Sequence, residues 1–305
     1  MKIYELKSFA KINLALHVTG KLIKLHKIES IVKFTKLHDL ITIKRIDSNK
    51  HKISFSGIFS KNIQKDNTID KLFKILDEKK LLKNKKFQIK IQKNIPQEAG
   101  LGGGSMNAAT ILNFLIKKKF VKINQKKILQ ITNLIGSDVI LGIDQKSTIL
   151  SSSRGIKKFL KSSNFYILLV RPNFGCSTKK IYSGIKKFSK PVLNNPNKNM
   201  LNLKFLLKQE NALEKVAFSK YPKLKKLKSL LKYENDLEKV VFSKYPKLRI
   251  LKSYLENLNQ PLFVRMTGSG SVLVAYYQRK QDCELAKVKF KRKFRNYWCN
   301  ASKTI

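Results

Sequence analysis

The sequence has few cysteines, few acidic residues and no long apolar segment, and each shortage excludes a class of protein. Its three cysteines are widely spaced and form no CxxC pair, which argues against a zinc site and predicts a reducing compartment. At the N-terminus, Lys7, Lys11 and His17 interrupt any apolar core of a signal peptide. No apolar run approaches membrane-spanning length, and the run 165–170 is a core strand at most. We therefore expect a soluble, cytoplasmic protein without a membrane partner.

The shortage of acidic residues leaves a formal net charge of +46, from 65 basic and 19 acidic side chains. A charge of this size generally favours nucleic-acid binding. Here only eight of the basic residues are arginines, and the lysines are spread over the whole chain rather than gathered in one patch. Lysine, isoleucine and asparagine are abundant together, as A+T-rich codons would make them. We therefore expect no nucleic-acid partner, although a basic field would attract a polyanionic substrate such as a nucleotide.

Glycine is concentrated in residues 95–105, which contain four glycines followed by a serine. Residues 87–95 alternate apolar and polar side chains, as a half-buried strand does, and residues 106–116 have the apolar spacing of a helix. A glycine-rich turn that leads into a helix N-terminus binds phosphate, because the backbone comes close to the anion and the helix dipole attracts it. The segment lacks the Lys-Ser or Lys-Thr of a P-loop and the spacing of the dinucleotide fingerprint. A flexible linker is disfavoured because a strand and a helix flank it.

The chain is long enough for two medium domains with cores of their own. A turn at 151–155 is the expected boundary between them. The apolar patterns predict strands over 12–18, 40–46 and 165–170, helices over 67–76 and 126–135, and a strand–turn–strand–helix ending over 263–298.

One segment occurs twice, because residues 210–224 return as 234–248 at an offset of 24 residues. A solenoid needs about three or more repeats to be stable. We therefore interpret the pair, which spans 210–257, as a local tandem duplication that adds helical length. The second copy has Asp236 where the first has Ala212, and we interpret the first as the surplus copy.

Three further clusters contain residues suited to chemistry: residues 10–14, residues 136–139 and residues 266–271. Taken singly they are weak, because Lys11 is one of 57 lysines, Asp138 could be a turn acid and the third cluster could be a plain hairpin. Together with the glycine segment, and in this order, they resemble the GHMP family of small-molecule kinases. The match continues through other short segments along nearly the whole chain: His26 to Ser30, Pro172, Ser177, Thr178, Tyr182, Asn235 to Glu238, and Lys303 to Ile305.

The resemblance implies an α+β fold of two GHMP domains with the active site in the cleft between them. Residues 1–155 would form the N-terminal nucleotide-binding domain, and residues 156–305 the C-terminal domain with the duplication 210–257. It also implies ATP and Mg²⁺ as cofactors. The metal ligands stay open, because Met106 and Asn107 stand where the family usually has Ser-Asp. Leu25 replaces the aromatic residue usually found before His26, which leaves its effect on the base-binding platform open.

The resemblance also implies roles for particular residues. Asp138 would accept the proton of the acceptor hydroxyl, and Lys11 would stabilise the negative charge that develops. His26 would hydrogen-bond the cytosine of the acceptor and Tyr182 would stack on it, while Asn13 and Thr178 would help to position the acceptor. Ser105 is also a candidate contact of the metal. The nucleotide would be bound by the loop residues Pro96, Gln97, Glu98, Ala99, Gly100, Leu101, Gly102, Gly103, Gly104, Ser105 and Met106.

The branch of the family that the motifs resemble phosphorylates the 2-hydroxyl of 4-diphosphocytidyl-2-C-methyl-D-erythritol, in non-mevalonate isoprenoid precursor synthesis. The expected partner is thus a small molecule, and we expect a monomer or a weak homodimer. Alternatives within the family are kinases of homoserine, mevalonate or a sugar, and a weakened homologue that binds nucleotide without efficient turnover. A basic nucleic-acid binder is a further alternative, which the even distribution of lysine disfavours.

Overall fold

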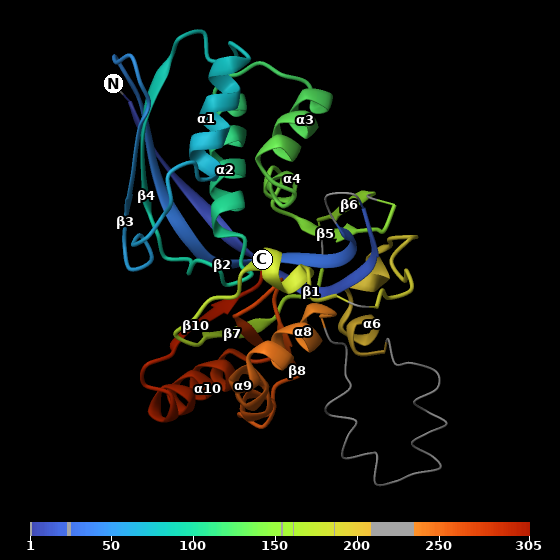
Figure 1. The fold of residues 1–305 in the computed structure, drawn as a ribbon. Coiled ribbons are helices and arrows are strands. Elements are labelled where there is room, and N and C mark those ends of the chain that lie inside the picture. The colour runs from blue at the N-terminus through green and yellow to red at the C-terminus, as the bar shows by residue number, and fades with distance from the viewer. Residues whose placement is uncertain (1, 23–25, 154, 161, 186, 209–234) are drawn as a thin grey trace, which may run out of the picture. The chain divides into compact units, whose positions relative to one another are not determined.

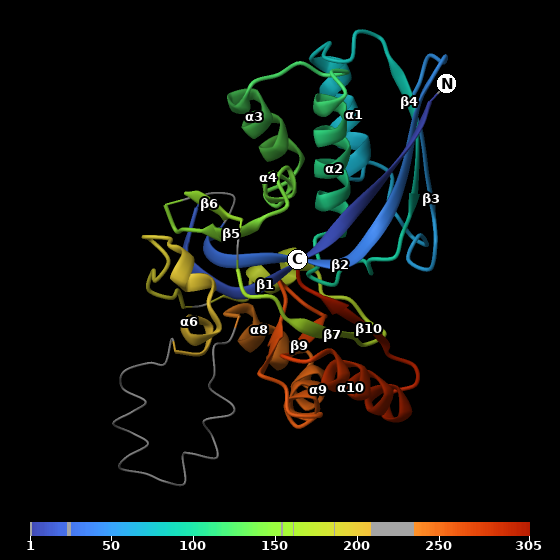
Figure 2. The same cartoon turned by 180° about the vertical axis from the view of Figure 1, so that it is seen from behind.

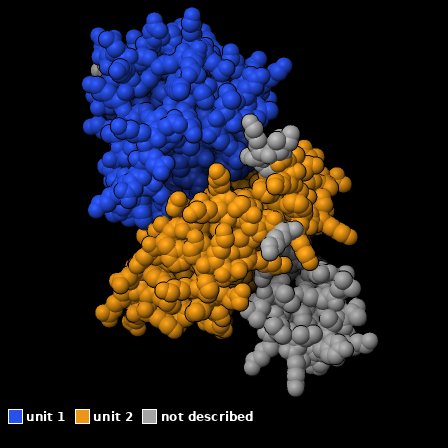
Figure 3. Space-filling view, in the orientation of Figure 1, with its two compact units in different colours: residues 1–11, 34–97, 101–145 blue, residues 12–33, 98–100, 146–305 orange. Residues whose placement is uncertain are grey.

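A computed structural model describes residues 2–22, 26–153, 155–160, 162–185, 187–208 and 235–305. The chain divides into two compact units, which Figure 3 colours blue and orange. Unit 1 comprises residues 1–11, 34–97 and 101–145, and unit 2 comprises residues 12–33, 98–100 and 146–305. The boundary expected after residue 155 stays a prediction, because each unit combines separate stretches of the chain. The location of the active site in a cleft between two domains also stays a prediction.

Unit 1 is a sheet with helices packed on it. The strands β1 and β2 begin or end in this unit, and Leu40–Ile46 of β2 pairs antiparallel with β4, which pairs parallel with β3. Buried isoleucines recur at every second position, with Ile41 opposite Ile91 and Ile43 opposite Ile89, so one face of the sheet is apolar. The strands have these bounds: β1 (Ile3–Lys21), β2 (His26–Ile46), β3 (Lys52–Ser56) and β4 (Lys86–Gln92).

The helices of unit 1 cover that apolar face, and α1 and α2 lie side by side on it in Figures 1 and 2. Helix α1 starts at a capping box, in which the Asn67 side chain accepts from Asp70 N and Asp70 accepts from Asn67 N. The buried residues of α1 follow the helical period and join the apolar core of this unit. The helices have these bounds: α1 (Thr68–Glu78), α2 (Gly103–Lys117), α3 (Gln125–Ile135) and α4 (Val139–Gly142).

Unit 2 contains two sets of paired strands. Residues Ser30 to Val32 of β2 pair antiparallel with β5, which pairs with β6. A separate four-stranded antiparallel sheet has the order β10-β7-β9-β8. The strands have these bounds: β5 (Ser147–Leu150), β6 (Ile156–Phe159), β7 (Tyr166–Arg171), β8 (Phe263–Met266), β9 (Leu273–Tyr277) and β10 (Trp298–Lys303).

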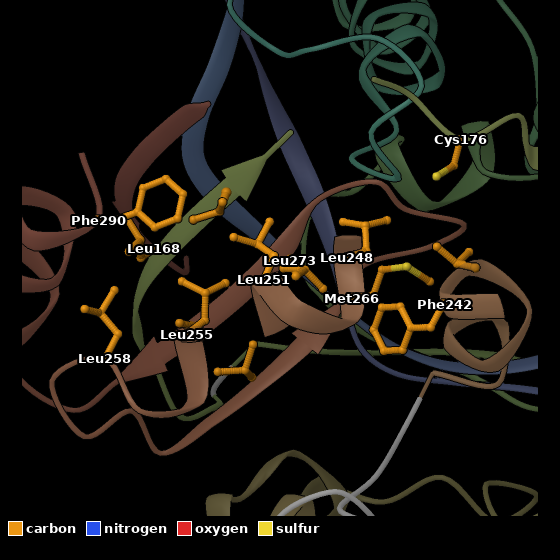
Figure 4. Close-up of a cluster of buried hydrophobic side chains, with 14 of the residues drawn as sticks. Leu168, Cys176, Phe242, Leu248, Leu251, Leu255, Leu258, Met266, Leu273 and Phe290 are labelled. Carbon is orange, nitrogen blue, oxygen red and sulfur yellow. The ribbon is translucent and has the colours of Figure 1, made fainter. Parts of the chain in front are cut away.

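Helices α9 and α10 pack against the four-stranded sheet of unit 2 (Figure 1). Figure 4 shows the core that results, in which Leu251 and Leu255 of α9 meet Leu168 and Leu273 of the strands, with Phe290 of α10 nearby. The helical segments have these bounds: α5 (Thr178–Tyr182), η1 (Lys198–Leu201), α6 (Leu203–Lys208), α8 (Leu237–Lys244), α9 (Pro246–Glu256) and α10 (Lys280–Lys293).

The elements predicted from apolar spacing are confirmed, although strands 12–18 and 40–46 are parts of much longer strands. The strand–turn–strand–helix ending is confirmed as β8, β9 and α10. Leu25 and the first copy of the duplication, residues 210–233, lie outside the described residues. Within the described ranges, none of the helices combines the length and the apolar character that a bilayer crossing requires.

Candidate functional site

The glycine segment lies where the sequence predicts it, between β4 and the N-terminus of α2. Gly102 precedes the helix with φ +68°, a left-handed conformation that favours glycine. No side chain caps the helix at this residue, and its first turn contains no acidic residue. The first N–H groups of a helix have no intrahelical partner, and the helix dipole makes this end positive. The end of α2 therefore presents donors to an anion.

The walls of this glycine segment contain lysine side chains. A Cβ on Gly102 would lie 2.8 Å from Cγ of Lys11, and one on Gly103 would lie 3.2 Å from Nζ of Lys93. On Gly104 it would lie 3.1 Å from Oγ1 of Thr68. A side chain at Gly102 would thus collide with Lys11, and one at Gly103 or Gly104 would crowd its neighbours, whereas glycine leaves the backbone close to two lysine side chains. This arrangement fits a phosphate group.

Lys11 and Asp138 are brought together in unit 1. Nζ of Lys11 lies 3.2 Å from Oδ2 of Asp138, and the exposed fractions of the two side chains are 6% and 33%. The backbone fixes both ends of the pair, because Lys11 N donates to Leu101 O at 3.0 Å and Asp138 is the residue before α4. The predicted proximity of the two residues is confirmed, while their chemical roles stay predictions.

Asp39 is a residue of this site that the sequence analysis missed. Its side chain is fully buried, and Oδ1 accepts from the backbone N of Asn94 and of Ile95, each at 2.8 Å. Oδ2 accepts from Nζ of Lys93 and, at 2.9 Å, from Nδ2 of Asn107. One carboxylate thus joins the end of β4, the start of the glycine segment and α2. The only sequence feature that could have indicated it is an acidic residue next to an apolar strand.

Asn107, at the position where the family usually has Asp, is buried in this cluster. Its amide donates to Asp39, and its Oδ1 is buried without a hydrogen-bond partner in the described structure. A neutral amide is favourable at this buried position, because it donates a hydrogen bond to Asp39, whose charge is already paired with Lys93. Asn107 is thus bonded inside the unit as a support of α2.

Most other side chains of the loop are engaged within the protein. The side chain of Met106 is fully buried and faces Gly142, whose Cβ position lies 3.0 Å from its sulfur. Nε2 of Gln97 donates to the carbonyls of Phe59 and Lys61, at 2.8 and 2.9 Å. The side chains of Pro96, Ala99 and Leu101 are also buried. Nucleotide binding by these residues stays a prediction.

In unit 2, Asn13 is held from two directions. Its backbone N donates to Oγ1 of Thr267 at 3.0 Å, and its Nδ2 donates to Oγ of Ser30 at 2.7 Å. The hydroxyls of Thr178 and Ser269 are 2.9 Å apart, so Thr178 is bound to the same turn that holds Asn13. The two predicted acceptor residues are thereby linked through residues 267–269.

His26 and Tyr182 lie together in unit 2, with ring centroids 5.1 Å apart and an interplanar angle of 41°. Burial, with a smaller effect from the charge of Lys21, lowers the pKa of His26 below its usual value of 6.5. The imidazole is therefore neutral near pH 7 and has one donor and one acceptor nitrogen. Such a ring can hydrogen-bond the edge of a base, which is the predicted role.

The turn between β8 and β9 also contacts residues 98–100, a contact that was not predicted from the sequence. Gly100 approaches it so closely that a Cβ would lie 1.9 Å from the carbonyl oxygen of Thr267. Ser271 N donates to Glu98 O at 3.3 Å, and Val272 N donates to Ala99 O at 3.4 Å. The middle of the glycine segment is thus fixed by backbone bonds to this turn.

The family of the protein follows from comparison with known proteins. The GHMP kinases N terminal domain matches residues 67–151, and the GHMP kinases C terminal domain matches residues 231–296. With the full-length relative described next, these matches show that the chain belongs to the GHMP kinase family.

The chain is similar over its whole length to a particular enzyme of that family. The 4-diphosphocytidyl-2-C-methyl-D-erythritol kinase of Pelagibacter ubique (strain HTCC1062) is 53% identical over 305 residues, which cover 100% of both chains. A crystal structure of 4-(cytidine 5'-diphospho)-2C-methyl-D-erythritol kinase matches with a TM-score of 0.73 at 20% identity, covering 99% of this chain and 100% of that one. A crystal structure of L. major mevalonate kinase in complex with R-mevalonate matches with a TM-score of 0.62 at 12% identity, covering 99% of this chain and 95% of that one. At these identities the two structures show the fold alone.

Proposed function

We propose that this chain transfers the γ-phosphoryl group of ATP to the 2-hydroxyl of 4-diphosphocytidyl-2-C-methyl-D-erythritol, a step of non-mevalonate isoprenoid precursor synthesis. The observation that supports a kinase most directly is the Lys11–Asp138 pair in unit 1, the unit that also contains Gly102, Gly103, Gly104 and the start of α2. The full-length identity with the Pelagibacter enzyme supports the acceptor.

The N-terminus of α2 and the glycine segment would bind the phosphates of the nucleotide. Asp138 would accept the proton of the tertiary hydroxyl as its oxygen attacks phosphorus, and its partly exposed carboxylate suits that role. Lys11, held beside Asp138 and along Gly102, would stabilise the negative charge that builds up on the transferring group. Phosphoryl transfer depends mainly on such positioning and charge stabilisation.

Mg²⁺ would neutralise the nucleotide phosphates. Such an ion commonly takes one or two protein ligands and completes its shell with phosphate oxygens and water. The described ranges contain no group of three or more His, Cys, Asp or Glu side chains that could hold a metal ion. The nucleotide phosphates would therefore hold most of the ion, with Ser105 as a candidate protein contact.

The acceptor would be recognised by the residues of unit 2. Neutral His26 would hydrogen-bond the cytosine, and the neighbouring ring of Tyr182 would stack on it. Asn13 and Thr178 would orient the rest of the acceptor, since both are bonded to residues 267–269. A cytoplasmic monomer or weak homodimer, without nucleic-acid or membrane partners, stays a prediction.

A substrate panel tests the proposal. ADP release by the purified chain is measured with ATP, Mg²⁺ and one alcohol at a time: the diphosphocytidyl alcohol, homoserine, mevalonate or galactose. A reaction without any alcohol gives the background of ATP hydrolysis. We expect ADP release well above background with the diphosphocytidyl alcohol alone. Turnover with another alcohol of the panel would overturn the proposed identity of the acceptor. ATP binding without turnover of any alcohol would favour a weakened homologue that binds nucleotide without efficient turnover.

A further inference from the structure

Asn235 lies two residues before helix α8 and is buried, with an exposed fraction of 2%. Its Nδ2 donates to the carbonyl of Gly268 and, at 3.2 Å, to the carbonyl of Met266. Its Oδ1 accepts from Leu237 N at 3.1 Å, which fixes the orientation of the amide. One side chain thus binds two carbonyls of the turn that follows β8.

Glu238 binds the other side of the same turn. It is fully buried, and its Oε1 accepts from Met266 N at 2.6 Å. Its Oε2 accepts from Nζ of Lys252 at 2.7 Å, so the buried charge is paired. Both backbone groups of Met266 are therefore held, the N–H by Glu238 and the carbonyl by Asn235. The side chain of Met266 is itself packed in the core shown in Figure 4.

Asn235 and Glu238 together form a clamp on the turn after β8. The residue whose position this clamp fixes is Thr267. Its Oγ1 accepts from Asn13 N at 3.0 Å and lies 3.3 Å from the carbonyl of Gly100, to which it can donate. Thr267 therefore contacts a predicted acceptor residue and the glycine segment at once. All of these contacts lie within unit 2.

We propose that Asn235 and Glu238 are positioning residues of the transfer reaction, which act through Thr267 on Asn13 and Gly100. The inference rests on the proposed function, because it assigns the clamp to that reaction. Neither residue needs to touch a substrate. Their effect comes from fixing the turn, since a small displacement of a positioned group costs much of the rate.

The tandem duplication supplies a matched control for this proposal. Asn211 and Glu214 of the first copy stand at the same offsets as Asn235 and Glu238 of the second. In the second copy, Asp236 also accepts from Val18 N at 2.7 Å and from Oγ of Ser189 at 2.7 Å, whereas the first copy has Ala212. The second copy is thus the one that the proposal assigns to the site.

The test compares Asn235→Asp, which keeps the shape and removes the donors, with Asn211→Asp in the first copy. We expect Asn235→Asp to lower kcat/KM for the acceptor by on the order of tenfold to a hundredfold. The Kd of this variant for ATP should change by a smaller factor than its kcat/KM. Asn211→Asp should match the parent in kcat/KM for the acceptor and in Kd for ATP. Glu238→Gln and Glu214→Gln form a second such pair, with the same expectation.

Thr267 provides the variants that separate positioning from mere stability. Thr267→Val removes the hydroxyl and should reproduce the loss, while Thr267→Ser retains it and should restore most of the activity. Combined with Asn235→Asp, Thr267→Val should add little, since both act along one path. If Asn235→Asp and Glu238→Gln do not fold, Thr267→Val and Thr267→Ser decide the proposal, because they test the hydroxyl through which the clamp acts.

The proposal is overturned if the first-copy variants lose as much activity as their counterparts. It is also overturned if the second-copy variants only unfold at lower temperature and keep the kinetic constants of the parent, or if Thr267→Val is fully active. Failure of the proposed function would look different. In that case the parent itself would not turn over the diphosphocytidyl alcohol, and the variants would be compared on whichever alcohol of the panel it phosphorylates.

Discussion

The ammonium group of Lys11 lies 3.2 Å from the carboxylate of Asp138, and the lysine is almost fully buried while the aspartate is one-third exposed. The stem of Lys11 lies along Gly102, so the position of its charge is fixed by the chain at the start of α2. The carboxylate keeps part of its surface open. This asymmetry suits a fixed cation that stabilises charge and a base that an acceptor can reach.

Replacing Asp138 with Asn tests the base. The amide has nearly the same shape but does not accept a proton at neutral pH, so we expect kcat to fall by about 10²–10⁴-fold. ATP binding, measured by calorimetry without acceptor, should stay close to that of the parent. A variant with a near-parental rate would rule out Asp138 as the base.

Lys11→Met removes the charge and roughly keeps the volume of the stem against Gly102. Loss of one group that stabilises transition-state charge typically costs about 10²–10³-fold in kcat. We expect a loss of that size in steady-state assays, with the fold retained by circular dichroism. A rate within a few-fold of the parent, with only the KM of the acceptor raised, would instead make Lys11 a binding residue.

Asn107→Asp tests the buried cluster under the glycine segment. The change replaces a donor to Asp39 with a second carboxylate, and the two would share the ammonium of Lys93. We expect a lower free energy of unfolding at pH 7–8, by on the order of 1–3 kcal/mol. The deficit should shrink as the pH falls, because a proton taken up by the pair restores a donor. Activity below the unfolding temperature should change only modestly.

The control for this variant is Asn133→Asp on the exposed surface of α3, which should leave stability nearly unchanged. A fully stable Asn107→Asp protein would contradict the account of the cluster, as would a deficit that grows with acidification. A gain in activity of tens of times would favour the weakened homologue.

Lys33 makes stability depend on alkaline pH. It is fully buried, its Nζ donates to Ser163 O and, at 3.1 Å, to Oδ1 of Asn164, and burial lowers its pKa to about 8. An unfolded lysine titrates at about 10.4. Between these values the unfolded chain binds a proton that the folded chain has released, so the contribution of Lys33 to stability rises with pH.

The measurement is the difference in free energy of unfolding between the parent and Lys33→Met from pH 7.5 to 10. We expect the free energy of unfolding of the parent to rise relative to that of Lys33→Met as the pH increases through this window. Lys36→Met, at an exposed lysine of the same strand, should show no such trend. A difference that is constant with pH, or that falls, would contradict the lowered pKa.

The glycine segment and the elements that flank it could be predicted from local sequence. Alternation before the glycines and helical spacing after them predict β4, the loop and α2, because both patterns report burial of nearby residues. The pairing of Lys11 with Asp138 came from the order of short motifs rather than from spacing. Local patterns contain no information about which distant groups meet.

Asp39 and Thr267 show where prediction from the sequence stops. Asp39 lies in the long strand β2 and binds the backbone after β4, and Thr267 binds Asn13 from the far end of the chain. Their roles depend on tertiary contacts that only the folded chain creates. The two compact units are discontinuous for a similar reason, since β1 and β2 each contribute to both.

The most direct test of the central claim is the ³¹P NMR spectrum of the product formed from ATP and the diphosphocytidyl alcohol. The account predicts one new phosphomonoester, attached to the tertiary carbon that bore the 2-hydroxyl, in equal amount to the ADP released, with the diphosphate bridge intact. Inorganic phosphate in place of that ester, or a phosphate on another hydroxyl, would contradict it.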